Sequence, residues 1–400
     1  MLVIDDAAYR ETVATLEKLV SIRSVNPPGN EDEIVGVVKS LLAENGIDST
    51  IVPLADERSS LVARIPGRES GSIVLCGHLD TVNADEAKWT VHPFEPRIED
   101  GRMWGLGSAD MKSGVATIIE IALLIVRSGV MPKKDIVLVL TGDEEYSYSG
   151  AASVAKSGLI DDAGFLLITE PTAGRAYCGQ KGELWVEVTF SGRAAHGSIP
   201  ALGISAILPA ARFCLALNER AKGFEEYPGR GRTSLNIGQF DGGWQVNIVP
   251  DTARVKLDIR TVSVDDKKMA LELIERLGRE EAEKEGAKFS MKVLADKDPI
   301  ISDADDQYVQ AFLSAVAGSR VTGSPVTGSA VADGDKLPKV EIAPYSTDAV
   351  EIVPSLGVPV VIYGPGDIAQ AHQPDEFLEL SSLRGALAVV ASFMNQELET

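Results

Sequence analysis

IVLCGHLDT, residues 73–81, is the stretch that decides the fold, because an unbroken apolar run ends there in a histidine and an aspartate. A short apolar run of this kind is typical of a strand buried on both faces of a sheet. Since strand side chains alternate between faces, His78 and Asp80 are expected to point the same way. The two residues either belong to a functional site or form a hydrogen-bonded pair at the protein surface. This stretch alone does not distinguish the two alternatives.

The chain around this stretch, up to about residue 175, alternates helical and strand patterns. Apolar side chains at helical spacing predict helices over Val13–Val20 and Ile34–Leu42, and a longer helix is expected over Gly114–Val130. Apolar strands are predicted at Ser60–Ile65, Ser72–Cys76, Asp135–Thr141 and Phe165–Thr169. Such alternation predicts the α/β fold class, with helices covering both faces of the sheet.

A different pattern begins near Ala176. Polar and apolar residues alternate over Glu183–Phe190, which predicts a half-exposed strand, and similar alternation recurs over Val255–Ile259. A charged helix is expected from Asp265 to about Glu285. These features predict a smaller antiparallel sheet with helices on one face.

The apolar strand and helix patterns return in the last part of the chain, at Val358–Tyr363 and Ser381–Asn395. The middle block is therefore expected to be an insertion into one larger domain. We predict a larger domain formed by residues 1–175 and 294–400, with an inserted domain at residues 176–293.

Length, charge and hydrophobicity limit the possible functions. A chain of 400 residues is too long for one ordinary core, so two domains are expected, and 44% hydrophobic residues make a sizeable buried core possible. The net charge of −21 argues against binding to nucleic acid or to an anionic membrane. Glu120 and Arg127 interrupt the most apolar window, Gly114–Met131, which fits a buried helix better than a membrane span. Residues 1–6 lack the basic start and apolar run of a signal peptide, so a cytoplasmic location is expected.

Four further polar pieces lie where an α/β sheet places ligand sites, most of them just beyond a predicted strand. Asp110 sits in the glycine-rich stretch 104–114, at the start of a predicted helix. Three consecutive acids occupy residues 143–145, Glu170 ends another strand, and residues 371–376 read AHQPDE. Each piece alone also has a structural explanation, such as a helix N-cap for Asp110 or a solvated strand end for the acids.

Taken together, the pieces supply two histidines and three or more carboxylates. Nitrogen and oxygen ligands of this kind suit zinc, and also cobalt or manganese. A pair of metals about 3.5–4 Å apart needs a bridging carboxylate, with a histidine and an acid for each ion. Adjacent glutamates can divide their roles, since one can bind metal while the other takes a proton from water.

Three motifs stand in the order and spacing of a known family: GHLDTV at 77–82, GLGSADMKSG at 105–114 and DEE at 143–145. Over nearly its whole length the sequence resembles the metallopeptidase family of acetylornithine deacetylase, succinyl-diaminopimelate desuccinylase, carboxypeptidase G and aminoacylase. The resemblance implies a zinc-aminopeptidase-like mixed sheet flanked by helices. It also implies that the insertion is an α+β, ferredoxin-like lid through which the chain forms a homodimer.

The resemblance further implies a ligand set, carried over residue by residue. Asp110 would bridge two metal ions, with His78 and Glu170 completing one site and Glu145 and His372 the other. The ions implied are two Zn²⁺, with Co²⁺ or Mn²⁺ as alternatives.

Catalytic roles follow from the same resemblance. Glu144 would be the general base, and Asp80 would orient His78. His196 would reach the partner subunit's active site and stabilise the tetrahedral oxyanion, although from the residues alone it reads equally as a polar loop histidine. A cis peptide is implied between Asp110 and Met111.

Two residues of the inserted domain are implied to bind substrate. Arg260 would grip the substrate's α-carboxylate, because its planar fork matches two oxygens; a surface arginine at a strand edge is the alternative. Asn247 lies in GGWQVNIVP, residues 242–250, which also resembles the family. His92 lies outside every motif and is assigned no metal role.

The implied activity is cleavage of the amide bond of a small N-acyl amino acid. Residues 345–349 and 364–376 look most like acetylornithine deacetylase, whereas Glu170 matches the desuccinylase and carboxypeptidase branch. We therefore rank an acetylornithine deacetylase of arginine biosynthesis first. A broader N-acyl amino-acid deacylase, a desuccinylase, and a dipeptidase or carboxypeptidase follow. A catalytically inactive metal-binding homologue is the alternative outside the enzymes.

Overall fold

The computed structural model describes residues 1–55, 57–321 and 340–398. The chain forms two compact units, which are described separately. The larger unit comprises Met1–Gly179, Ile301–Glu341 and Thr347–Thr400, and the smaller comprises Gln180–Ile300 and Ile342–Ser346.

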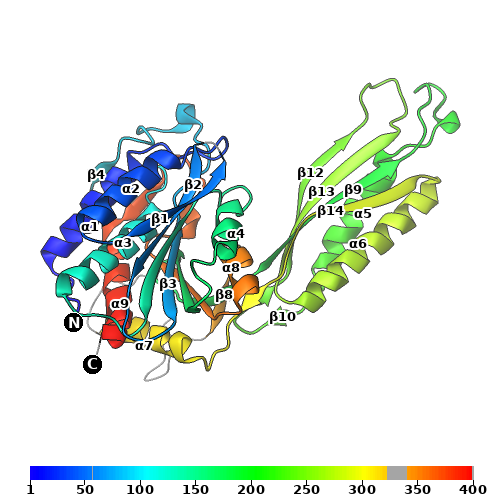
Figure 1. The fold of residues 1–400 in the computed structure, drawn as a ribbon. Helices are drawn as coiled ribbons and strands as arrows, with labels where there is room; N and C mark the ends of the chain where they lie inside the picture. Colours follow the sequence, from blue (N-terminus) through cyan, green and yellow to red (C-terminus); the bar gives the residue numbers. More distant parts are fainter. Residues whose placement is uncertain (56, 322–339, 399–400) are drawn as a thin grey trace. The chain divides into compact units, whose positions relative to one another are not determined.

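A mixed sheet is the centre of the larger unit (Figure 1). Its strand order is β1-β2-β6-β3-β7-β17-β8-β15, and β16 pairs with β8. Strand β3 runs parallel to β6 and β7, and β7 runs parallel to β17, whereas β1, β2 and β6 pair antiparallel. The strands are β1 (Ser49–Ala55), β2 (Arg58–Ile65), β3 (Ser72–His78), β6 (Asp135–Thr141), β7 (Ala163–Pro171), β8 (Tyr177–Gln180), β15 (Ile300–Ile301), β16 (Glu341–Ala343) and β17 (Val360–Gly364).

Helices cover both faces of this sheet. One face packs against α2 (Asp32–Glu44), α3 (Lys112–Ser128), α7 (Gln307–Val321) and α9 (Leu380–Leu398), and α1 (Asp6–Val20) packs on α3 (Figure 1). The other face packs against α4 (Ser149–Lys156), and α8 (Ala349–Leu356) packs on α4. Strands β3 and β6 read as continuous apolar runs because both of their faces are buried.

Shorter elements lie in the connections of the larger unit. A three-stranded sheet has the order β18-β5-β4. Its strands and the short 3-10 helices of this unit are β4 (Arg97–Glu99), β5 (Arg102–Trp104), β18 (Phe377–Glu379), η1 (Glu86–Lys88) and η3 (Ile368–Gln370).

The smaller unit is an antiparallel sheet of order β12-β13-β9-β14 with two helices. Along the chain its main elements follow a β-α-β-β-α-β sequence, which is the ferredoxin-like arrangement. Apolar residues of β9 alternate into a core with α5 and α6, where the rings of Phe190, Phe213 and Phe289 pack together. The elements are β9 (Gly182–Ser191), η2 (Pro200–Leu202), α5 (Ile207–Ala221), β10 (Glu226–Tyr227), β11 (Gly231–Arg232), β12 (Ser234–Gly242), β13 (Thr252–Thr261), α6 (Val264–Glu285) and β14 (Lys288–Lys297).

The fold class predicted from the sequence is confirmed: the chain has a mixed sheet flanked by helices and a smaller α+β unit. Strand β14 continues to Lys297, past the expected end of the insertion at residue 293, because it pairs with β9 along its length. Within the described ranges, no helix has both the length and the apolar character that a membrane crossing requires.

Candidate metal centre

The carboxyl ends of the parallel strands bring the polar motifs to one edge of the sheet. His78 is the last residue of β3, Glu170 lies at the end of neighbouring β7, and Glu145 follows β6 on the other side of β3. Asp110 directly precedes Met111, the N-cap of α3, and His372 follows β17 after η3. Parallel strands end at the same edge of a sheet, which is where α/β folds place ligand sites.

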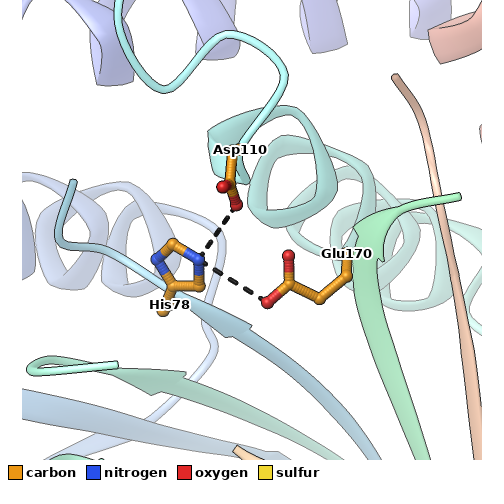
Figure 2. Close-up of side chains that lie close together, drawn as sticks. All are labelled: His78, Asp110 and Glu170. Atoms are coloured by element: carbon orange, nitrogen blue, oxygen red, sulfur yellow. Dashed lines mark hydrogen bonds and ion pairs between the residues drawn. The ribbon is translucent and has the colours of Figure 1, made fainter. Parts of the chain in front are cut away.

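His78, Asp110 and Glu170 form a first group of possible metal ligands, and all three are buried (Figure 2). The Nε2 atom of His78 lies 3.3 Å from Asp110 Oδ1 and 3.6 Å from Glu170 Oε1. One ligand atom from each side chain lies within 4.8 Å of the others, which leaves room for one ion between them.

Asp110, Glu145 and His372 form a second group of the same kind. His372 Nε2 lies 2.9 Å from Glu145 Oε2 and 3.5 Å from Asp110 Oδ2. The two oxygens of Asp110 therefore face different groups, Oδ1 toward His78 and Oδ2 toward His372. A carboxylate that bridges two ions has this arrangement.

The charges of the two groups fit divalent cations. Burial and the neighbouring Asp110 carboxylate raise the pKa of Glu170 well above its ordinary value, and the same causes raise the pKa of Glu145. The hydrogen bond with Glu145 raises the pKa of His372 to about 9. Among the described residues, no lysine or arginine forms an ion pair with any of the five side chains. Buried carboxylates without a cation are costly, and bound metal would offset that cost.

Glu144 lies beside the first group without belonging to either group. Its Oε2 is 3.9 Å from His78 Nε2, and the residue is 9% exposed. Burial and the carboxylates of Glu170 and Glu145 raise the pKa of Glu144 well above its ordinary value. A buried carboxylate with a raised pKa, held next to a possible metal site, is suited to accept a proton from water.

Asp80 makes a different contact from the one expected. His78 Nδ1 lies 2.9 Å from the backbone carbonyl oxygen of Asp80 but 3.8 Å from its carboxylate, which is too far for a hydrogen bond. The carboxylate instead accepts the backbone N–H groups of Glu144 at 3.1 Å and Glu145 at 3.2 Å. The backbone carbonyl therefore orients the imidazole, and the carboxylate orients the two glutamates.

The other expected site residues belong to the smaller unit. His196 Nδ1 accepts the backbone N–H of Ser198 at 3.1 Å, so the proton of the neutral ring is on Nε2. Asn247 lies next to this histidine loop, because its carbonyl oxygen accepts the N–H of Gly197 at 2.7 Å. The structure thus brings His196 and Asn247 together within this unit.

Arg260, also in the smaller unit, is engaged by two acids. Its Nη1 lies 2.7 Å from Glu183 Oε2, and its Nε donates to Asp258 Oδ1 at 2.8 Å. Nε and Nη2 of Arg260 both donate to Asp258, so a substrate carboxylate that bound to these two nitrogens would have to replace Asp258.

Sequence reasoning missed the residues that support the metal centre. Buried Glu376 accepts the N–H groups of Ala109 at 2.7 Å and Asp110 at 3.0 Å, and so holds the Asp110 loop. Buried Asn26 donates to Asp80 at 2.9 Å. Glu376 lies inside the AHQPDE piece, but Asn26 precedes two prolines and reads as part of a turn, so no sequence pattern marks it.

Two smaller expectations concern the same loops. The peptide bond between Asp110 and Met111 is cis, as the family resemblance implies. His92 accepts the N–H of Phe94 at 3.2 Å through Nδ1 and belongs to neither ligand group.

Known proteins similar to this chain include curated relatives that match it over most of their length. A probable succinyl-diaminopimelate desuccinylase from Staphylococcus epidermidis is 30% identical, over 92% of this chain and 93% of that protein. An acetylornithine deacetylase from Photorhabdus laumondii is 28% identical, over 97% of this chain and 95% of that protein.

Solved structures share the fold. A tripeptidase from Staphylococcus aureus superposes with a TM-score of 0.81 at 23% identity, covering 98% of this chain and 99% of that one. A dinuclear metal-binding peptidase from Bacillus subtilis has a TM-score of 0.74 at 18% identity, covering 99% and 100%. The model of the family described as "Peptidase family M20/M25/M40" matches residues 74–396, which include all five possible ligands. The chain is therefore a member of peptidase family M20/M25/M40.

Proposed function

We propose that the chain is a two-metal amidohydrolase that removes the acyl group from the nitrogen of a small amino acid. The observation that carries this proposal is the pair of ligand groups sharing Asp110, with Glu144 beside them and outside both. A binding protein has no need of a buried carboxylate kept out of the ligand set, whereas a hydrolase needs a base there.

The proposed ligands are those of the two groups: His78 and Glu170 for one ion, Glu145 and His372 for the other, and Asp110 for both. Two Zn²⁺ ions, or Co²⁺ or Mn²⁺, would supply a Lewis acid for the amide carbonyl and lower the pKa of a nearby water. Glu144 would hold that water and take its proton as it attacks the carbonyl carbon. Glu144 would then return the proton to the amine nitrogen as the amide bond breaks.

His196 is the proposed donor to the oxyanion that forms during the attack. Its Nδ1 is occupied as an acceptor, so Nε2–H is available to donate. We propose that the smaller unit acts as a lid and dimerisation domain, that His196 serves the partner subunit's site, and that Arg260 and Asn247 bind the substrate. A homodimer in the cytoplasm is part of the same proposal.

N-acetylornithine is the substrate we propose first. The similarity to the Photorhabdus laumondii acetylornithine deacetylase and the C-terminal motifs support this choice. N-succinyl-diaminopimelate is the second candidate, because the Staphylococcus epidermidis relative is slightly more similar over a comparable span. Both substrates present a linear amide and a free α-carboxylate, so the same catalytic groups would serve either one.

The test combines substrates with one substitution. Purified chain loaded with zinc or cobalt is assayed with N-acetylornithine, N-succinyl-diaminopimelate and a tripeptide, and bound metal is measured by elemental analysis. We expect turnover of an N-acyl amino acid by the wild type, and a loss of several orders of magnitude in Glu144→Gln with both metals retained. Undiminished turnover in metal-loaded Glu144→Gln would show that another group is the base.

A further inference from the structure

The turn that carries Glu144 and Glu145 begins at a strained residue. Asp143 has a φ of 65°, in the left-handed region, which is unfavourable for a residue other than glycine. Its carboxylate accepts hydrogen bonds from Ser147, from Ser149 at 2.5 Å and from Arg58 at 2.9 Å. The conformation that presents the two glutamates is thus held by contacts of the Asp143 side chain.

The same turn is held from the other side by Asp80. Its Oδ1 accepts the N–H of Glu144 and its Oδ2 accepts the N–H of Glu145. The position of both glutamates therefore depends on two carboxylates, Asp143 within the turn and Asp80 opposite it. Both carboxylates are buried, with Asp80 fully inaccessible and Asp143 2% exposed.

Asn26 joins these two carboxylates. Its side-chain nitrogen donates to Asp80 Oδ2 at 2.9 Å and to Asp143 Oδ1 at 2.9 Å. Both N–H bonds of the amide are used in this way, and its oxygen has no hydrogen-bond partner among the described residues. A flipped amide would turn that oxygen toward two anions, so the orientation follows from the charges alone.

The backbone around Asn26 is fixed to residues 79–81, which directly follow the strand that ends at His78. Asn26 N–H donates to the carbonyl oxygen of Thr81 at 2.8 Å, and Thr81 N–H donates to that of Ser24 at 2.9 Å. The Ser24 hydroxyl donates to the carbonyl oxygen of Leu79 at 2.6 Å. The amide of Asn26 therefore approaches Asp80 and Asp143 from a rigid support rather than from a free loop.

Removing the amide would leave the two carboxylates without their shared donor. Arg58 would not compensate, because its guanidinium pairs with Glu31 and with Asp143 and makes no ion pair with Asp80 among the described contacts. Two buried anions that lose a common donor repel each other and gain by moving apart. The backbone N–H groups of Glu144 and Glu145 would move with the Asp80 carboxylate.

We propose that Asn26 is a positioning residue that sets where Glu144 and Glu145 stand, by bridging the carboxylates of Asp80 and Asp143. Through Glu145 it tunes the affinity of one metal site, and through Glu144 it tunes the proton transfer. The second consequence rests on the proposed function, whereas the first rests only on Glu145 being a ligand. Substitution of a side chain that supports a metal ligand typically lowers metal affinity or activity by about 10–100-fold.

The experiment compares Asn26→Ala and Asn26→Asp with Thr12→Ala. Asn26→Asp keeps the shape of the side chain and replaces its two donors with acceptors. Thr12→Ala removes a buried hydrogen bond inside α1, from the Thr12 hydroxyl to the carbonyl oxygen of Ala8 at 2.8 Å, and touches neither carboxylate nor the support of Asn26. Metal-free protein is titrated with Zn²⁺ in a competition assay, kcat and KM are measured on the best substrate, and melting temperatures are recorded. Asn26→Ala is also made in a Glu145→Gln background.

In both Asn26 variants we expect one metal-binding step to weaken about tenfold or more, and kcat to fall about 10–100-fold with KM changed less than about threefold. Thr12→Ala should lower the melting temperature while keeping metal affinity and kcat. In the Glu145→Gln background, Asn26→Ala should add no further loss of metal affinity.

Unchanged metal affinity in the Asn26 variants, or an equal added loss in the Glu145→Gln background, would overturn the proposal. A wild type that binds two metals but hydrolyses no substrate would contradict the proposed function instead. In that case the metal titration still decides the role of Asn26.

Discussion

At the scale of single residues, the two ligand groups meet at Asp110, which belongs to both. One of its oxygens lies 3.3 Å from His78 Nε2 and the other 3.5 Å from His372 Nε2. Its backbone N–H is held by Glu376 at 3.0 Å. Both proposed ions therefore depend on one side chain, and that side chain depends on a loop held by a buried glutamate.

Asp110→Asn should weaken both metal-binding steps, because an amide offers only one oxygen and no charge to share. Glu170→Gln should weaken only one step. Elemental analysis after dialysis against a weak chelator measures the difference, with fewer than about one ion per chain expected for Asp110→Asn and about one for Glu170→Gln. His92→Ala is the matched control and should keep the wild-type metal content. If Asp110→Asn kept two ions, Asp110 would not be the bridge.

Glu376→Gln tests the support of the same loop. The two carboxylate oxygens accept N–H groups from Gly107, Ala109 and Asp110. A glutamine has one acceptor oxygen, so at least one buried N–H would face an NH₂ group and lose its partner. The free energy of unfolding should fall by about 1–3 kcal/mol, as measured by urea denaturation.

Glu379→Gln is the control for this change. Glu379 is exposed and pairs with Arg102 on the surface, so its loss should cost less than about 1 kcal/mol. If the two substitutions lowered the free energy of unfolding equally, the supporting role of Glu376 would be contradicted.

At the scale of elements, α3 connects the metal loop to the core. Its first residue, Lys112, is fully buried and donates through Nζ to the carbonyl oxygens of Leu19 at 3.0 Å and Ile22 at 2.8 Å, near the end of α1. The helix is buried over most of its length, as its largely apolar sequence predicts. Glu120 is the acid inside it, 1% exposed and without a hydrogen-bond partner among the described residues.

Glu120 makes stability depend on pH. Burial raises the pKa of this carboxyl to about 7 from its ordinary 4.5, and Glu11 adds to the shift. Between those two values the folded chain binds more protons than the unfolded one, so the contribution of Glu120 to stability falls as pH rises from about 4.5 to 7 and is constant above.

Glu120→Gln should remove this dependence. The variant should match the wild type near pH 4.5 and exceed its stability by about 2–3 kcal/mol at pH 8. Urea midpoints of both proteins at the two pH values measure the difference, in which the titration of all other groups cancels. A gain that is the same at both pH values would contradict the assignment.

At the scale of the whole molecule, the candidate residues divide between the two units. The larger unit holds both ligand groups and Glu144, and the smaller holds His196, Asn247 and Arg260. Ligand binding stabilises the part of a protein that contains the site. Metal should therefore act directly on one unit only.

Hydrogen exchange with and without Zn²⁺ tests this division. We expect added protection at residues 78–81, 105–114 and 142–148 of the larger unit, where the loops carry ligands or are held beside them. Strands β9 and β13 of the smaller unit should change little in the absence of substrate. Strong metal-dependent protection confined to the smaller unit would place the metal site elsewhere.

The sequence by itself determined the fold class and the places where ligands gather. Continuous apolar runs mark strands that are buried on both faces. The polar residues that directly follow such a run in the chain lie at the end of its strand, which is where α/β folds place ligand sites. His78, Glu145 and Glu170 could be found in this way, from local pattern alone. The residue types also pointed to divalent metal, since imidazole and carboxylate together are its common ligands.

Only the tertiary structure decided how these groups face one another. That the oxygens of Asp110 point to different histidines, and that the carboxylate of Asp80 binds backbone amides instead of His78, depends on side-chain rotamers and loop geometry. Asn26 meets Asp80 across 54 residues of chain and Asp143 across 117. Contacts of that kind leave no periodic trace in a sequence, because their partners are neighbours in space and not along the chain.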